Sequence, residues 1–194
     1  MKRITPTLFP ILAFALSISL TACNKSQFSG NNSEFEQIHN QLIDNGNEAD
    51  ETMDTEVHSY NFTLSENKTL SSIGYESNPD LSNVDYLIEI INTSDSSVVY
   101  SGNHQFSDNG ISYVSPNTAV NLQSNVVYQL NRVQTNWNPY IDQTIGHLVR
   151  TTDADYPLNS GALTITESNF FDYGEAPQNW TQNFALPRID LVFE

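Results

Sequence analysis

The chain has 194 residues, of which 38% are hydrophobic and 11% aromatic, enough to bury the core of one domain and to exclude wholesale disorder. Seven Lys and Arg residues face 23 Asp and Glu residues, and the resulting net charge of −16 disfavours nucleic acid as a partner because phosphate backbones are repelled. The single cysteine excludes an internal disulfide and a multi-cysteine zinc site.

The N-terminal segment has the features of an export signal. Lys2 and Arg3 precede an apolar stretch over residues 8–20, which is interrupted by Pro10 and two serines. This stretch is shorter than the roughly 20 residues that a bilayer-spanning helix needs, so it fits the apolar region of a signal peptide better than a permanent anchor. We therefore expect residues 1–22 to be a signal peptide.

The residues that end this segment are Leu20-Thr21-Ala22-Cys23. This motif resembles the lipobox of bacterial lipoprotein signal peptides, in which an aliphatic residue and two small residues precede the modified cysteine. The resemblance implies a thioether-linked diacylglyceryl group on Cys23, cleavage before Cys23 and acylation of the new amino terminus. An ordinary secretory signal with a chance cysteine is the alternative, and the position of the sole cysteine favours the lipoprotein.

The same resemblance predicts where the protein resides. In Gram-negative lipoproteins an aspartate directly after the cysteine is associated with retention in the inner membrane, whereas this chain has Asn24. The expected location is therefore the cell envelope, and the outer membrane if the host has one. Cleavage removes Lys2 and Arg3 and leaves five basic side chains against 23 acidic ones, a net charge of −18. Anionic headgroups repel such a surface, so the lipid on Cys23 has to provide the membrane attachment.

Residues 23–56 differ in composition from the rest of the chain and predict an acidic linker. Residues 34–56 include eight acidic side chains and no Lys or Arg, so this segment is expected to be extended and solvated. A short helix over 34–44 interrupts it, because Ser33 and Glu36 match a capping box and Phe35, Ile38 and Leu42 share one helical face. The sequence leaves open whether this helix docks on the domain or a partner, and it favours an undocked, frayed helix.

From residue 57 the apolar residues alternate with polar ones, which predicts β-strands. Candidate strands lie at residues 60–64, 70–75, 84–91, 97–100, 111–114, 119–122, 126–130, 145–149, 162–166 and 189–193. Clusters of Asn, Asp, Ser, Gly and Pro separate them at turn-like spacings. The expected fold of residues 57–194 is an all-β, antiparallel two-sheet β-sandwich of jelly-roll-like form. The last strand is expected to be central in its sheet.

Several segments of this domain also resemble uncharacterised β-sandwich domains of bacterial secreted proteins. These segments are residues 64–75, 86–90, 100–102 and 186–190. The resemblance covers residues 57–194 and supports the fold, but it transfers no functional site.

Catalytic motifs are absent from the sequence: it contains no nucleophile elbow, zinc-protease helix, dinucleotide fingerprint or phosphate loop. The histidines occur singly, and His147, between Gly146 and Leu148, is expected to be a strand residue rather than a catalytic base. Paired carboxylates for glycoside hydrolysis can lie far apart in sequence, and no pair stands out here. We therefore expect no enzymatic activity.

Two loops combine aromatic rings with amides, carboxylates and proline. The first holds Trp137 and Tyr140, and the second holds Tyr173 and Trp180. Exposed rings beside Asn, Asp and Gln suit sugar recognition, because the rings stack on C–H faces and the polar groups bind hydroxyls. The alternative is that these rings pack over the open ends of the sandwich. For each loop taken alone, this packing role is the favoured interpretation. These four residues are the candidate ligand-binding set.

Calcium is the one metal that the sequence suggests. Asp153 and Asp155 offer hard oxygen ligands in a loop, but their spacing does not match an EF-hand. Such clusters commonly form turns instead, and the turn is the favoured interpretation. No other cofactor is expected.

These features together predict a lipid-anchored cell-envelope protein with a non-catalytic binding β-sandwich. The expected ligand is a glycan or an envelope protein. The alternatives from other classes are a structural or accessory envelope lipoprotein and a small hydrolase with carboxylates that the sequence does not identify.

Overall fold

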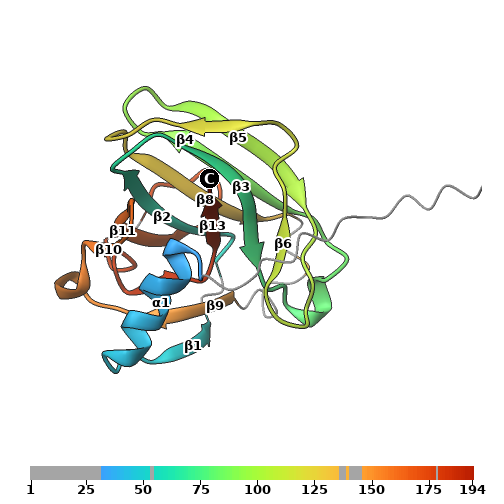
Figure 1. Ribbon diagram of the computed structural model, residues 1–194. Coiled ribbons are helices and arrows are strands. Elements are labelled where there is room, and N and C mark those ends of the chain that lie inside the picture. The colour runs from blue at the N-terminus through green and yellow to red at the C-terminus, as the bar shows by residue number, and fades with distance from the viewer. Residues whose placement is uncertain (1–31, 53–54, 136–138, 140–145, 178) are drawn as a thin grey trace, which may run out of the picture. The chain divides into compact units, whose positions relative to one another are not determined.

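The fold is an all-β antiparallel sandwich with one α-helix packed against it in the part of the chain that the structure describes (Figure 1). The structure is a computed structural model, and it describes residues 32–194 except for 53–54, 136–138, 140–145 and 178. Period-two alternation predicted this architecture, and the prediction of an all-β sandwich is confirmed. Cys23 lies outside the described residues.

The strands form three antiparallel ladders. The largest has the order β10 (Leu158–Ser160), β11 (Leu163–Phe171), β2 (Val57–Leu64), β8 (Tyr128–Gln134), β4 (Tyr86–Asn92) and β5 (Ser97–His104). The second has the order β13 (Asp190–Phe193), β3 (Lys68–Tyr75) and β6 (Ser112–Val114), and β7 (Val120–Leu122) also pairs with β3. The third has the order β1 (Ala49–Thr52), β9 (Gly146–Arg150) and β12 (Ala185–Pro187). Short 3-10 helices, η1 (Pro79–Leu81) and η3 (Asp153–Asp155), lie in connections.

The core lies between the six-stranded ladder and the ladder of β3 and β13. Alternation along β2 buries Tyr60, Phe62 and Leu64 on its inner side, each no more than 1% exposed. The ring of Phe62 lies 6.3 Å from the ring of Phe193 in β13, so the two ladders meet through aromatic contacts. The hydroxyl of Tyr60 donates to the carbonyl of Ile189 at 2.8 Å, which satisfies a polar group inside the sandwich.

The helix α1 (Glu34–Asp44) is docked, so the favoured expectation of a frayed helix is wrong. Phe35, Ile38 and Leu42 are at most 3% exposed and belong to the main core. Polar contacts also hold the helix, because the Ala162 backbone N–H donates to Glu34 at 2.9 Å. Burial of the apolar face supplies the stability that a helix of 11 residues lacks in isolation.

An extended linker was expected over residues 23–56, and the strand β1 corrects this expectation within the part that the structure describes, from residue 32 onward. Residues from Asn32 onward belong to the same compact unit as the sandwich, and β1 pairs with β9 in antiparallel register. An acidic side chain of β1 has a basic partner on the neighbouring strand, because Arg150 Nε of β9 donates to Asp50 Oδ2 at 3.0 Å. Pairing with a distant strand, rather than local hydrophobicity, therefore orders this acidic segment.

The last strand also differs from the prediction. Among the described strands β13 pairs with β3 alone and ends its ladder, so it is an edge strand rather than a central one. Its side chains are nevertheless buried, with Leu191 at 0% and Val192 at 4% exposed. The apolar sequence of β13 reflects burial beneath α1 and the opposite ladder, not a central position.

Candidate functional site

The structure describes two of the four residues that the sequence predicts to bind a ligand. Tyr173 and Trp180 lie in the segment between β11 and β12 and are 51% and 72% exposed. Both rings are therefore open to solvent instead of filling the core. Trp137 and Tyr140 lie outside the described residues, so whether the four share one surface stays a prediction.

Tyr173 stands beside the outer face of the six-stranded ladder. Residues of this face alternate with those that point into the main core, and antiparallel register aligns them across neighbouring strands. Several of them are themselves buried, such as Ser59 at 2% and Asn131 at 6% exposed. One row, here called the polar row, consists of Ser101, Glu89, Asn131, Ser59 and Asn169. A parallel apolar row beside it consists of Leu87, Val133, Val57 and Phe171, which pack together apart from the main core. The face thus presents a stripe of amide, carboxylate and hydroxyl groups next to an apolar stripe.

Glu89 is the central charge of the polar row. Burial raises the pKa of its carboxyl, and hydrogen bonds from the side chains of Asn131 and Tyr173 oppose this shift. The reciprocal effect is seen on the ring, because the negative charge of Glu89 raises the pKa of the Tyr173 hydroxyl. Glu89 therefore links the sheet face to the aromatic loop residue that the sequence had singled out.

Asn131 offers an unused acceptor at this point. The residue is 6% exposed, and its Oδ1 atom has no hydrogen-bond partner among the described residues. A buried amide oxygen without a partner is costly unless a ligand or solvent donor reaches it. This oxygen is closed to solvent, so the polar row holds one unsatisfied buried acceptor next to the Glu89 carboxylate.

Backbone contacts fix the position of Tyr173. Its N–H donates to Glu56 Oε2 at 2.9 Å, which ties the start of the loop to the residue before β2. Further along, Glu167 Oε1 accepts from Asn61 Nδ2 at 2.6 Å and Glu167 Oε2 accepts from Gln182 Nε2 at 3.2 Å. The loop is therefore attached to the sheet face near both of its ends, on either side of Trp180.

Sequence reasoning found Tyr173 but missed Glu89 and Asn131. Tyr173 stood out because aromatic residues are concentrated in its loop. Glu89 and Asn131 are single polar residues inside strands, where alternation marks them only as facing outward. Their meeting depends on the pairing of β4 with β8, which the sequence of either strand does not specify.

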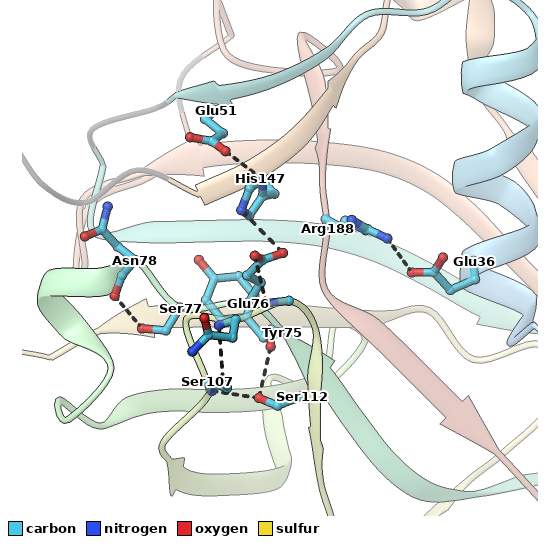
Figure 2. A network of polar contacts seen from close by, with 12 residues as sticks. Glu36, Glu51, Tyr75, Glu76, Ser77, Asn78, Ser107, Ser112, His147 and Arg188 are labelled. Carbon is cyan, nitrogen blue, oxygen red and sulfur yellow. Dashed lines mark hydrogen bonds and ion pairs between the residues drawn. The ribbon is translucent and has the colours of Figure 1, made fainter. Parts of the chain in front are cut away.

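A second polar group lies on a different part of the molecule, around His147 (Figure 2). His147 is in β9, as the expectation of a strand residue required. Its Nδ1 lies 3.3 Å from Glu51 Oε1 of β1, and its Nε2 lies 3.5 Å from Glu76 Oε2, just after β3. Glu76 also accepts from the Gly110 backbone N–H at 3.1 Å. The imidazole of His147 thus bridges a carboxylate of β1 and one of the segment after β3.

The calcium candidates Asp153 and Asp155 are engaged in a turn. Asp155 Oδ2 accepts from the Thr152 backbone N–H at 2.7 Å, and Asp153 Oδ1 accepts from Asn183 Nδ2 at 2.8 Å. Both carboxylates thus stabilise η3 and its neighbouring loop. In the described part of the chain, no group of three or more His, Cys, Asp or Glu side chains is arranged to hold a metal ion.

Comparison with known proteins identifies no family for this chain. No protein-family model matches the sequence, and no curated protein matches it. Within the residues that the structure describes, none of the helical structure is long and apolar enough to cross a bilayer.

Proposed function

We propose that this chain is a lipid-anchored cell-envelope protein whose β-sandwich binds a neutral glycan without catalysing a reaction. The observation that carries the binding proposal is the partly buried Glu89 carboxylate on the outer sheet face, whose pKa is lowered by side-chain hydrogen bonds from Asn131 and Tyr173. The lipobox at residues 20–23 supports attachment through Cys23 and a location in the envelope, at the outer membrane in a Gram-negative host.

A glycan suits the chemistry of the polar row. Sugar hydroxyls both donate and accept hydrogen bonds, and the partly exposed Glu89 carboxylate of the row offers them acceptor oxygens. Tyr173 adds a half-exposed ring that can stack on the apolar face of a sugar. The same groups can also bind a polar protein surface. An envelope protein is therefore the alternative ligand, and the experiment has to distinguish it from a glycan.

The charge of the chain favours a neutral ligand. After signal-peptide cleavage the net charge is −18, and Glu89 places one of these charges at the centre of the polar row. An acidic polysaccharide would be repelled from this surface. A neutral glycan avoids that repulsion and still receives charge-assisted hydrogen bonds from its hydroxyls to Glu89.

The engagement of the carboxylates on this face supports binding rather than hydrolysis. Glycoside hydrolysis uses two carboxyl groups that flank the scissile bond, one of them as a proton donor. Glu167, the other acidic residue of the face, has each oxygen hydrogen-bonded to an amide, from Asn61 and Gln182. Both oxygens of Glu167 are thus occupied by amide donors of the protein itself.

The test is a glycan array probed with the purified protein and with two variants of the site. Glu89→Gln removes the charge at the centre of the row, and Tyr173→Ala removes the ring. We expect the protein to bind neutral glycans and each variant to lose at least about tenfold in affinity, the loss of one good hydrogen-bonding or stacking contact.

Ile43→Ala is the matched control, because Ile43 is 38% exposed on α1 and lies away from the sheet face. It should bind like the unmodified protein, and all variants should keep their melting temperatures. Binding confined to acidic glycans, or retained in full by both site variants, would contradict the proposal. Binding to an envelope protein and to no glycan would instead identify a protein as the ligand.

A further inference from the structure

The tripeptide Asp-Asn-Gly occurs twice in the chain, at residues 44–46 and 108–110. The first copy spans the end of α1, and the second lies in the connection between β5 and β6. Both asparagines are exposed, and both glycines have a positive φ, +92° for Gly46 and +88° for Gly110, with no atom within 4 Å of the place that a Cβ would take. The two copies therefore match in sequence, in asparagine exposure and in glycine conformation.

An asparagine that precedes a glycine is chemically labile. The backbone nitrogen of the glycine can attack the side-chain amide carbon of the asparagine and close a succinimide ring, and glycine has no Cβ to obstruct this approach. The attacking nitrogen has to lose its proton, so the group that accepts the hydrogen bond from the glycine N–H influences the rate. The two copies of the tripeptide differ in this acceptor.

In the first copy the acceptor is a backbone carbonyl. Gly46 N–H donates to the carbonyl of Ile43 at 2.9 Å, a bond that belongs to the end of α1. In the second copy the acceptor is a carboxylate, because Gly110 N–H donates to Glu76 Oε1 at 3.1 Å. A carboxylate can take up the proton as a general base, whereas a neutral carbonyl does not. Of the two copies, the second therefore has a base on its attacking nitrogen.

The position of Glu76 is fixed by contacts on two sides. Glu76 directly follows β3, and the backbone N–H of the next residue, Ser77, donates to the carbonyl of Ser107 at 2.9 Å. The second carboxylate oxygen of Glu76 lies 3.5 Å from His147 Nε2, a contact that Figure 2 shows. The side chain of Glu76 is only 20% exposed. The carboxylate is thus held between His147 and Gly110 instead of being free in solvent.

Asn109 is also held in this loop. Its Nδ2 donates to Asp108 Oδ1 at 3.0 Å, and its backbone N–H donates to Ser107 Oγ at 3.1 Å. The reacting residue and its base therefore lie in one short segment. A reaction between groups that are already held together avoids the entropy cost of bringing them into contact.

We propose that Asn109 is a site of spontaneous deamidation, with Glu76 as the general base and water as the second reactant. Glu76 takes the proton of Gly110 N–H while this nitrogen forms a bond to Asn109 Cγ. The Cγ–Nδ2 bond of Asn109 then breaks, and Nδ2 leaves as ammonia with the proton that Glu76 returns. Water opens the succinimide ring and leaves an aspartyl or isoaspartyl residue at position 109. The reaction does not depend on the glycan surface, because none of these residues belongs to the polar row.

The product changes the surface beside Glu76. Glu76, Asp108 and His147 line a depression of about 230 Å³, together with Glu51. Deamidation adds a negative charge next to Asp108, and an isoaspartyl link also lengthens the backbone by a methylene group. Because the added charge lies among carboxylates that repel it, we expect the modified loop to be less stable than the original one.

The test is incubation of the purified protein near neutral pH at physiological temperature, followed by proteolysis and peptide mass spectrometry. Deamidation is measured as a mass gain on the peptides that contain Asn45 and Asn109, and chromatography separates the aspartyl and isoaspartyl products. We expect Asn109 to react at least about tenfold faster than Asn45, because assistance by a general base contributes this much or more. After unfolding in urea the two rates should converge, since the tripeptides are identical.

Two variants test the role of Glu76. Glu76→Gln removes the base but keeps an oxygen that accepts from Gly110 N–H, so it should slow the reaction at Asn109 at least about tenfold and leave Asn45 unchanged. Glu51→Gln, the same substitution at the other carboxylate beside His147, is the matched control and should change neither rate. Equal rates at Asn45 and Asn109 in the folded protein would overturn the proposal. An Asn109 rate that Glu76→Gln leaves unchanged or increases would overturn it as well, because Glu76 would then not act as a base.

Discussion

The hydroxyl of Ser33 donates to Asp190 Oδ1 at 2.7 Å, across 157 positions of sequence. Ser33 is the N-cap of α1, and its Oγ also accepts from the Glu36 backbone N–H at 2.9 Å. The second oxygen of Asp190 accepts from the Tyr113 hydroxyl at 2.8 Å. One buried carboxylate thus joins the start of α1 to β13 and β6, and the N-terminal helix is attached to the sandwich by polar as well as apolar contacts.

The first prediction concerns the pH dependence of this contact. Burial raises the pKa of Asp190 from 3.8 to about 6, against the hydrogen bonds from Ser33 and Tyr113. Between these two pH values the folded protein retains a proton that the unfolded chain releases. The contribution of Asp190 to stability is therefore full below pH 3.8 and is lost as the pH rises through about 6, a change on the order of 3 kcal/mol.

Chemical denaturation across this pH range checks the sign. The free energy of unfolding of the unmodified protein, minus that of Asp190→Asn, should fall as the pH rises, because the amide does not titrate. Asp80→Asn, the same substitution at an exposed aspartate, is the control for removal of one surface carboxylate. A difference that rises with pH would show that the carboxylate is stabilised rather than destabilised by its surroundings.

The second prediction tests the docking of α1. Phe35 is fully buried, and its ring lies 5.7 Å from that of Tyr60 in β2. Phe35→Ala should lower the free energy of unfolding by about 3–5 kcal/mol, as for other aromatic truncations in cores. Ile43→Ala on the same helix, where Ile43 is 38% exposed, should change it by no more than about 0.5 kcal/mol. Equal effects of the two substitutions, measured by urea denaturation, would mean that the helix contributes nothing to the core.

A comparison of β4 with β1 shows which strands a local sequence pattern predicts and which it does not. In β4, Tyr86, Ile88 and Ile90 alternate with outward residues, so the pattern itself predicts a half-buried strand. The residues of β1 show no such alternation, and its partner β9 lies about a hundred residues away. The ion pair between Asp50 and Arg150 joins two segments that local patterns treat independently.

The same limit applies to the candidate site. The aromatic and amide content of its loop drew attention to Tyr173, a local property of the sequence. Glu89 and Asn131 are brought together by the pairing of β4 with β8, and Tyr173 joins them through a loop anchored at Glu56. A site assembled from distant strands depends on register, and register follows from packing of the whole sandwich.

The third prediction concerns membrane attachment. If Cys23 carries the lipid that the lipobox implies, Cys23→Ser should move the protein from the membrane fraction to the soluble fraction of the cell. Mass spectrometry of the protein without substitutions should find an N-terminal cysteine with a thioether-linked diacylglyceryl group. Substitution of Asn24 by alanine is the control, because it leaves the modified residue intact. An unmodified thiol with the signal segment still attached would contradict the lipoprotein proposal.

The fourth prediction examines the contact at the centre of the polar row. The Tyr173 hydroxyl donates to Glu89, and a donor to a carboxylate favours its charged form. Tyr173→Phe removes this donor and keeps the ring, so the pKa of Glu89, already raised by burial, should rise further. Carboxyl NMR titration measures this shift, and Tyr113→Phe, which acts on Asp190 instead, is the matched control. If Tyr173→Phe leaves the pKa of Glu89 unchanged while Tyr173→Ala abolishes glycan binding, the ring alone contributes to recognition and the hydroxyl does not organise the carboxylate.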